Sequence, residues 1–525
     1  MMRPVSPQAV KAMLADGEEL ALIDLREELI FSQNHLLWAR SVPLSRLELR
    51  FPRLVPRKTT RIVLCDDADG LAQRAADVLA RAGYSNLSHL DGGVAGWAAA
   101  GFELFSGVHV PSKAFGEFVE HACATPNIGA DELHRLIHDG SDMVVLDSRP
   151  FDEYRRVSIP TATNVPGAEL VLRVRDMAPS PDTLVVVNCA GRTRSIIGAQ
   201  SLINAGVPNK VVALRNGTMG FSLAGFTCES GKDQRAPKVS DQSLGWAKKA
   251  VKQVALRHGI ERIISDTLTR WRADDTRTLY LFDVRDAPEY LAGHVPGAIS
   301  TPGGQLVQAT DLYAGTLGAR IVLIDDAEVR AVMTASWLKQ MGWKDVFVLA
   351  EAGTETGRPA APVIAAEPPP ASGIDAKELA RLLKREAATV IDLSLSTNYR
   401  KGHIPGAWFA IRSRLERALP KIRRRREVVL TSEDGVLAGV AIADASAACN
   451  EPVRYVHGGN AAWQAAGLPF STESHMADDA VDVWLKPYER AGDTKDAMNE
   501  YLSWEVDLVS RIERDGTCHF TVGRP

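Results

Sequence analysis

The sequence has few cysteines, no long apolar run and no excess of one charge. Six of its 525 residues are cysteine, and no two of them form a C-x-x-C pair. That scarcity excludes a disulfide framework and a zinc ribbon, and it favours a reducing compartment. The sequence also lacks an apolar stretch of about 18 residues, and acidic side chains near its start occupy the place where a signal peptide needs an apolar core. We therefore expect a cytoplasmic protein.

Basic and acidic side chains nearly balance, with 61 Lys and Arg against 65 Asp and Glu. A chain without a basic excess has no global attraction for nucleic acid or for an acidic membrane, so neither is expected as a partner. Hydrophobic residues make up 45% and charged residues 24%, which is typical of a globular protein. A chain of this length is expected to form several domains.

One structural plan occurs four times along the chain. In each repeat a short apolar strand ends in an aspartate, and a similar hook, a second apolar strand and a helix follow. The four aspartates are Asp24, Asp147, Asp283 and Asp392. Three repeats also contain a glycine turn with an aromatic residue, at Trp97, Phe221 and Trp463. Buried strands that alternate with helices predict small α/β units with parallel sheets, whose chemistry lies at the carboxyl ends of the strands.

The order of three motifs, D-x-R, G-H-I/V-P-G-A and G-G-x-x-x-W, resembles the rhodanese (sulfurtransferase) family. DVRDAPEYLAGHVPGAIS in the third repeat is close to the family pattern by itself. The resemblance implies four rhodanese-like domains, each a central mainly parallel sheet flanked by helices. It also implies a six-residue loop that begins with a nucleophilic cysteine and carries sulfur on it as a persulfide.

The domains are expected at residues 1–105, 125–230, 255–356 and 372–474, followed by a helical tail at 475–525. The pattern lapses in three segments, which are interpreted as linkers: 103–127, 231–254 and the proline-rich 358–373. The apolar spacing in the tail predicts a helix that docks on the body of the protein, and we assign no chemistry to it.

Only the second repeat has a cysteine where the loop begins, at Cys189. The equivalent positions of the other repeats, found by spacing, hold Asp66, Asp325 and Ser432. Cys65 falls one place before the equivalent position and would end its strand. The sequence therefore predicts one catalytic domain, the second.

The segment VVVNCAGRTRSIIGAQSL predicts a strand, a tight turn and a helix, with Cys189 where the strand ends. Loop N–H groups and the helix dipole would favour the thiolate and would hold a persulfide anion. The positive charges of Arg192 and Arg194 suit the oxyanion end of thiosulfate. An inert buried thiol is the alternative. The predicted substrate-binding residues are Ala190, Gly191, Arg192, Thr193, Arg194 and Arg149.

Asp147 is predicted to support the site, either by orienting Arg149 or a loop arginine or by capping the turn that follows it. Cys189 and Arg194 form a C-x4-R loop, one residue shorter than the C-x5-R loop of protein tyrosine phosphatases. A shorter loop closes around a single sulfur atom and argues against phosphoryl transfer.

The loops of the other repeats carry carboxylates, in 66–69, 325–328 and 432–434, which should repel an anionic donor. These domains are interpreted as scaffolds or partner-binding modules; a cation site is the alternative.

Two functions fit this pattern. The first is a sulfurtransferase, in which Cys189 accepts a sulfane sulfur from a small anionic donor such as thiosulfate or a persulfide. A thiophilic acceptor then takes the sulfur, and cyanide, sulfite, a thiol or a protein would serve. The second is a redox- or sulfur-sensing scaffold that binds partners without turnover. Neither a cofactor nor a metal is expected.

Overall fold

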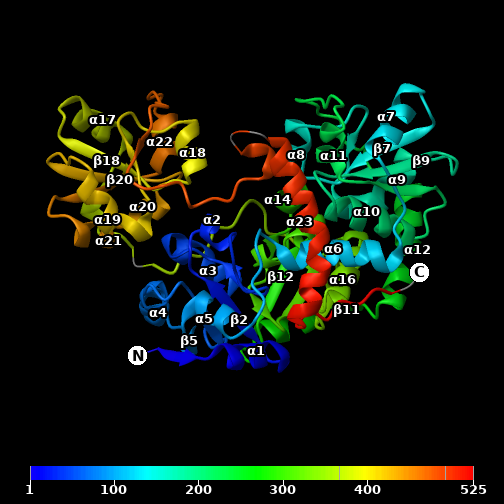
Figure 1. The fold of residues 1–525 in the computed structure, drawn as a ribbon, viewed down its shortest axis with the longest axis horizontal. Coiled ribbons are helices and arrows are strands. Elements are labelled where there is room, and N and C mark those ends of the chain that lie inside the picture. Colours follow the sequence, from blue (N-terminus) through cyan, green and yellow to red (C-terminus); the bar gives the residue numbers. More distant parts are fainter. Residues whose placement is uncertain (1, 366, 491, 493, 524–525) are drawn as a thin grey trace.

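A computed structural model of the chain describes residues 2–365, 367–490, 492 and 494–523. It contains four α/β units, each built on its own sheet (Figure 1). The four apolar strands expected to end in aspartate do so, because β2, β7, β12 and β18 end at Asp24, Asp147, Asp283 and Asp392. The predicted fold class, small parallel-sheet units flanked by helices, is confirmed.

The first unit orders its strands β1, β5, β4 and β2, and β3 also pairs with β2. Its strands are β1 (Arg3–Val5), β2 (Leu20–Asp24), β3 (Arg40–Ser41), β4 (Ile62–Cys65) and β5 (Leu87–Leu90). Its helices are α1 (Pro7–Ala15), α2 (Glu28–Phe31), α3 (Leu47–Leu54), α4 (Leu71–Arg81) and α5 (Gly93–Ala99).

The second unit orders its strands β6, β10, β9, β7 and β8, all parallel to their neighbours. They are β6 (Asn127–Ile128), β7 (Met143–Asp147), β8 (Thr163–Asn164), β9 (Leu184–Asn188) and β10 (Val211–Leu214). Its helices are α7 (Ala130–His138), α8 (Phe151–Arg156), α9 (Leu170–Met177), α10 (Thr193–Asn204) and α11 (Gly217–Leu223).

The third unit repeats this order as β11, β16, β15, β12 and β13. They are β11 (Glu261–Ile263), β12 (Leu279–Asp283), β13 (Ile299–Ser300), β15 (Arg320–Ile324) and β16 (Val346–Leu349). Its helices are α13 (Ser265–Arg272), α14 (Ala287–Ala292), α15 (Gly303–Gln308) and α16 (Val329–Gln340). A further strand of this unit, β14 (Thr316–Leu317), leaves its own sheet and pairs antiparallel with β2 of the first unit.

The fourth unit orders its strands β17, β21, β20, β18, β19 and β22. They are β17 (Gly373–Ile374), β18 (Ala388–Asp392), β19 (Trp408–Phe409), β20 (Glu427–Thr431), β21 (Val453–Val456) and β22 (His475–Met476). Its helices are α17 (Ala376–Lys384), α18 (Ser396–Lys401), α19 (Leu415–Ala418), α20 (Val436–Val440), α21 (Ile442–Ala448) and α22 (Gly459–Ala465). Figure 1 shows this unit at one side of the molecule, where it contacts the first unit through the ion pair of Arg412 with Glu48.

Two of the segments interpreted as linkers carry long helices, α6 (Val110–Cys123) and α12 (Asp241–Arg257). Both pack into the apolar core that the second and third units share, through Phe115, Val251 and Val254 among others. The linkers therefore join the domains rigidly. The proline-rich segment is the exception, because the only helix among its described residues is a short 3-10 helix, Pro370–Ser372.

The tail forms one long helix, α23 (Thr494–Asp515), which docks on α6 as the apolar spacing predicts. Leu508 and Ile512 of α23 pack with Val110 and Ala114 of α6. Figure 1 shows α23 running between the second unit and the first. The tail begins with β22 in the fourth sheet, and its segment before α23, with Lys486, reaches the carboxyl edge of the second sheet.

Candidate active site

Cys189 directly follows β9 and precedes α10, where the sequence predicts it. The residue is only 2% exposed, and its Sγ lies 3.5 Å from the hydroxyl oxygen of Ser195. The carbonyl groups of Cys189 and Ala190 accept hydrogen bonds from the N–H groups of Thr218 and Met219, at 2.8 and 2.9 Å. The loop carbonyls are therefore engaged by α11.

The N–H groups of residues 190–194 find no hydrogen-bond acceptor among the described residues. They lie at the amino end of α10, where the helix dipole also favours a negative charge. Gly217 permits α11 to pack closely against the loop, because a Cβ there would lie 2.4 Å from the carbonyl oxygen of Cys189. The loop is thus a set of free donors suited to an anion on the Cys189 sulfur.

Asp147 joins two side chains at the end of β7. It accepts hydrogen bonds from Arg149 at 2.8 and 2.6 Å and from the amide of Asn188, which precedes Cys189, at 2.9 Å. Both alternatives for Asp147 are present, because it orients the guanidinium of Arg149 and also caps the turn by accepting the backbone N–H of Arg149 at 3.1 Å. Arg149 is 1% exposed and also donates to the carbonyl of Val157. Its side chain points to the end of β7 and does not line the cavity, whereas the sequence predicted that Arg149 would contact the substrate.

The side chain of Arg192 points to helix α6 and is not free to bind a sulfur donor such as thiosulfate. Its guanidinium donates to both carboxylate oxygens of Glu117 at 2.7 Å and pairs with Glu120. These partners lie in the segment interpreted as a linker, so the sequence did not reveal them. The positive charge of Arg192 is thereby largely balanced.

Arg194 stays at the cavity, held by Glu153 of α8. The two side chains pair at 2.8 Å, and the amide oxygen of Gln305 in α15 accepts from Arg194 at 3.2 Å. Lys486 of the tail pairs with the same Glu153 carboxylate at 3.2 Å. Burial opposes ionisation, but Arg194 and Lys486 together hold the pKa of Glu153 well below its usual range.

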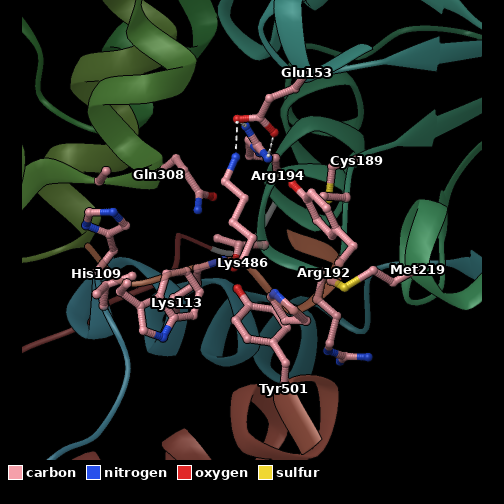
Figure 2. A pocket seen from close by; sticks show the side chains of 18 of the residues that line it. His109, Lys113, Glu153, Cys189, Arg192, Arg194, Met219, Gln308, Lys486 and Tyr501 are labelled. Atoms are coloured by element: carbon pink, nitrogen blue, oxygen red, sulfur yellow. Dashed lines mark hydrogen bonds and ion pairs between the residues drawn. The ribbon is translucent and has the colours of Figure 1, made fainter. Parts of the chain in front are cut away.

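The loop opens into a cavity of about 290 Å³ that four parts of the chain enclose (Figure 2). The second unit supplies Cys189 to Arg194, Glu153 and Met219. The third unit supplies Gln305, Gln308, Ala309 and Leu312. The first unit supplies Glu28, the segment before α6 supplies Val108 and His109, and α6 itself supplies Lys113. The tail supplies Trp484, Lys486, Pro487, Tyr488, Glu489 and Tyr501.

The tail therefore does more than the sequence indicates, since no chemistry was assigned to it. Glu505 of α23 is fully buried and accepts hydrogen bonds from Lys113 at 2.7 Å and from Tyr501 at 2.9 Å. Thr193, the first residue of α10, donates to the same oxygen at 3.4 Å. This carboxylate links the tail, α6 and the cysteine loop.

The equivalent loops of the first and third units hold their own carboxylate where an anion would bind. Asp66 accepts from the N–H groups of Ala68 and Ala72, both at 2.9 Å. Asp325 accepts from the N–H of Arg330 at 2.8 Å. The acidic loops were expected to repel an anionic sulfur donor. The structure shows a second effect, because the aspartate itself binds N–H groups of its loop.

The remaining cysteines lie outside this cavity. Cys65 ends β4 and is fully buried, and burial together with nearby Asp24 raises its pKa well above the ordinary value. Burial also raises the pKa of the other four thiols, which are Cys123, Cys228, Cys449 and Cys518. Each is therefore a weak nucleophile at neutral pH.

The described part of the chain contains neither a membrane-spanning helix nor a cluster of metal-ligating side chains. None of its helices is both long and apolar enough to cross a membrane. Residues 2–365, 367–490, 492 and 494–523 also contain no group of three or more His, Cys, Asp or Glu side chains placed to hold a metal ion.

Comparison with known proteins agrees with this geometry. One solved structure, thiosulfate sulfurtransferase from Pseudomonas aeruginosa, is 47% identical, covers 100% of both chains and superposes with a TM-score of 0.97. An uncharacterized protein of Synechocystis sp. is 32% identical over 110 residues, which is 20% of this chain and 58% of that relative. The chain thus spans less than two thirds of that curated relative. The profile of the rhodanese-like domain matches residues 6–100, 129–224, 266–353 and 375–466. The chain belongs to the rhodanese-like domain family and carries that domain four times.

Proposed function

We propose that this protein is a sulfurtransferase that carries a sulfane sulfur as a persulfide on Cys189. The observation behind the proposal is that Cys189 begins a loop whose N–H groups, at 190–194, have no acceptor among the described residues and lie at the amino end of α10. The donor is thiosulfate or a low-molecular-weight persulfide, and the acceptor is a thiophile such as cyanide, sulfite or a thiol.

The first half-reaction charges the cysteine. The Cys189 thiolate attacks the sulfane sulfur of thiosulfate, and a new sulfur–sulfur bond forms as the donor's own bond breaks. Sulfite leaves with the electron pair of the broken bond. The N–H groups of the loop hold the terminal sulfur of the persulfide as an anion, and Arg194 adds positive charge beside it.

The second half-reaction regenerates the free enzyme. The acceptor attacks the outer sulfur, the bond to Cys189 breaks, and its electron pair restores the thiolate. Cyanide becomes thiocyanate in this step. Neither half-reaction requires a general base once the thiolate is formed, which fits a cavity whose one imidazole, on His109, pairs with Asp311 at 3.0 Å.

Thiosulfate as the donor is supported by the Pseudomonas aeruginosa thiosulfate sulfurtransferase, whose likeness extends over the full length of both chains. Turnover is favoured over a sensing scaffold because a thiol sensor usually needs a resolving cysteine. Cys189 has no second cysteine beside it among the residues that line the cavity.

The intact mass of the purified protein tests this function. Thiosulfate should add the mass of one sulfur atom, and cyanide should then remove it with the release of thiocyanate. The Cys189→Ser variant should show neither change. Sulfur uptake in that variant would place the persulfide on another residue and overturn the proposal.

A further inference from the structure

The edge of the third sheet at β13 is uncovered, whereas the same edge is covered in the second and fourth units. In the second unit the segment after the domain runs along β8. There the N–H of Asn164 donates to the carbonyl of Gln234 at 3.0 Å, and its carbonyl accepts from the N–H of Ala236 at 3.2 Å. In the fourth unit β22 pairs parallel with β19, and the N–H of Ala477 donates to the carbonyl of Phe409 at 3.0 Å. In both units a downstream segment thus extends the sheet.

Ser300 of β13 occupies the equivalent place in the third unit. It lies opposite Asp283 of β12 as Asn164 lies opposite Asp147 of β7. The N–H of the next residue, Thr301, donates to the carbonyl of Asp283 at 2.8 Å, so the N–H and carbonyl of Ser300 point away from β12. Neither group has a hydrogen-bond partner among the described residues. β13 is therefore an edge strand with a free donor and a free acceptor.

The proline-rich segment explains why the third sheet lacks a covering strand. The chain leaves the third unit after an antiparallel bridge at Glu355, and it leaves the second unit after one at Glu229. Ala236, the donor to β8, lies seven residues after Glu229, and Pro362 lies seven residues after Glu355. Proline has no N–H, so Pro362 cannot cover the edge as Ala236 does. Residues 358–363 make no backbone hydrogen bond with the described chain, and the edge stays open.

A tyrosine marks this edge in the same three units. Tyr154 of the second unit donates to the side-chain oxygen of Gln234 at 3.1 Å, and Tyr399 of the fourth unit accepts the N–H of His475 at 2.9 Å. Both therefore bind the covering segment. Tyr290 of the third unit donates at 2.9 Å to a carbonyl of its own unit and has no other partner in the described chain. Its oxygen keeps the capacity to accept an N–H from a covering strand.

A groove of about 930 Å³ runs along the open edge. The third unit lines it with Tyr290, Ile299 and Ser300, and the segment that follows α3 lines it from the first unit. The proline-rich segment supplies Arg358 and Pro362 among others. The groove holds about 30 water-sized groups at roughly 30 Å³ each, which is the size of about four residues of a peptide.

The groove is basic. Six of its lining residues are Lys or Arg, and two are Asp. Arg53 and Arg358 are exposed and form no ion pair within the described chain. Burial raises the pKa of the Tyr290 hydroxyl, and the charges of Arg53 and Arg358 oppose that rise, so both guanidinium groups lie near the open edge. The six basic residues are Arg53, Arg57, Lys58, Arg272, Arg277 and Arg358.

We propose that this groove binds an extended, acidic peptide segment of a partner protein, which adds to β13 as a parallel strand. One carbonyl of the segment accepts the N–H of Ser300, and an N–H two residues further on donates to the carbonyl of Ser300. Carboxylates of the segment pair with Arg53 and Arg358. The backbone bonds supply affinity, and the charged side chains select the partner. This interaction surface is independent of the chemistry at Cys189.

A labelled peptide tests the proposal. Its sequence, STESHMADD, is that of residues 471–479, which cover β19 in the fourth unit and carry three carboxylates. It should bind the full-length protein, measured by fluorescence anisotropy. Bound peptide should also slow deuterium exchange in the fragment that contains Ser300, because the N–H of Ser300 becomes hydrogen-bonded. Absence of binding at millimolar peptide, or binding without this protection, would overturn the proposal.

Two altered peptides separate strand pairing from charge. STESHMPDD has proline at the place of Ala477 and so lacks the N–H that reaches the carbonyl of Ser300. STQSHMANN has the same backbone without carboxylates. Each should bind more weakly than STESHMADD by about fivefold or more. Equal binding of the proline peptide would refute strand pairing, and equal binding of the amide peptide would refute the selection of an acidic partner.

A pair of arginine variants locates the site. Arg53→Gln with Arg358→Gln should weaken binding of STESHMADD by about fivefold or more, and high salt should reduce the difference from wild type. Arg81→Gln with Arg381→Gln removes two exposed arginines of the first and fourth units, and this matched control should keep the affinity. Unchanged affinity in the first pair would place the peptide elsewhere, for example on β19 in exchange for β22, and would overturn the proposal. Sulfur transfer from thiosulfate to cyanide should be unchanged in both pairs.

A second copy of the chain is the other occupant that an open edge admits. It would protect the fragment with Ser300 from deuterium exchange in the absence of peptide, and the protection would rise with protein concentration. That result would overturn the partner peptide as the occupant. Loss of sulfur transfer in the wild-type protein would instead refute the sulfurtransferase and leave the groove unaffected.

Discussion

Lys486 of the tail pairs with Glu153 of the second unit at 3.2 Å. The same carboxylate holds Arg194 of the cysteine loop at 2.8 Å, so one side chain both closes the cavity and positions a loop cation. The tail is thereby part of the active-site wall, although more than 250 residues of chain separate it from Cys189. Substitutions in the tail should consequently affect sulfur transfer.

Glu153→Gln should lower both kcat/KM and stability. A hydrogen bond to a charged group contributes about 1.5–3 kcal/mol, and the variant weakens the contacts to Arg194 and to Lys486. We expect kcat/KM for thiosulfate to fall by about tenfold or more. Steady-state kinetics measure this, and Glu132→Gln, an exposed glutamate on α7, is the matched control. An unchanged kcat/KM in Glu153→Gln would show that the positioning of Arg194 by Glu153 does not contribute to sulfur transfer.

The stabilisation by Glu153 should depend on pH in a defined direction. Arg194 and Lys486 depress the pKa of Glu153 in the folded state, so its ion pairs stabilise the protein fully above the unfolded value of about 4.3. That stabilisation is lost as the pH falls toward the folded pKa. The difference in Tm between wild type and Glu153→Gln should therefore be largest near neutral pH and shrink on acidification. A difference that grows in acid would contradict the assignment.

Lys113 and Glu505 form a buried pair whose two halves should depend on each other. The atoms that pair, Nζ and Oε1, lie 2.7 Å apart, and the side chain of Glu505 is 0% exposed. Lys113→Met should cost about 3–5 kcal/mol of unfolding free energy, because it leaves a buried carboxylate unpaired. The double variant Lys113→Met, Glu505→Leu should recover much of that loss. Denaturant unfolding of both single variants and the double variant measures the coupling, and additive losses would exclude it.

A variant in which the other five cysteines are replaced by alanine should retain sulfur transfer. Burial raises the pKa of each of these thiols, and none of them lines the cavity. The positions are Cys65, Cys123, Cys228, Cys449 and Cys518. The rate of thiocyanate formation measures the outcome, with Cys189→Ser as the inactive control. A folded variant that lost most of its turnover would identify a relay thiol.

The repeated strands could be predicted from sequence because their signal is local. An apolar run that ends in Asp147 or Asp283 predicts a buried strand of a parallel sheet, and both strands are present. The position of Cys189 followed from spacing alone. Its surroundings did not, because Glu505 and Lys486 reach the site through tertiary packing, which apolar spacing along one helix does not specify.

Shorter signals were missed for a related reason. β14 has two residues, too few for a periodic pattern, yet it adds a strand from the third unit to the sheet of the first. Glu117 lies in a segment interpreted as a linker, so its pairing with Arg192 could not be anticipated. Charges close in sequence, such as Arg192 and Arg194, indicate where an anion binds only when the partners that neutralise them are known.

The internal carboxylate of the first unit gives the sharpest test of what silences a loop without a cysteine. Asp66 accepts the N–H groups of Ala68 and Ala72 at 2.9 Å, as an anion on a cysteine would. In a Cys189→Ser background, Asp66→Cys restores a thiol but keeps Asp67 and Asp69 beside it, and Leu71 stands where the second unit has Arg194. Asp67 and Asp69 are exposed, and each disfavours a second anion by about 1 kcal/mol at about 4 Å in water, less for Asp67 because it pairs with Arg26. We therefore expect no sulfur uptake from thiosulfate, read as the mass of one added sulfur atom. Uptake as ready as that of Cys189 in the parent protein would show that only the missing thiol, and not the charge of the loop, distinguishes the units.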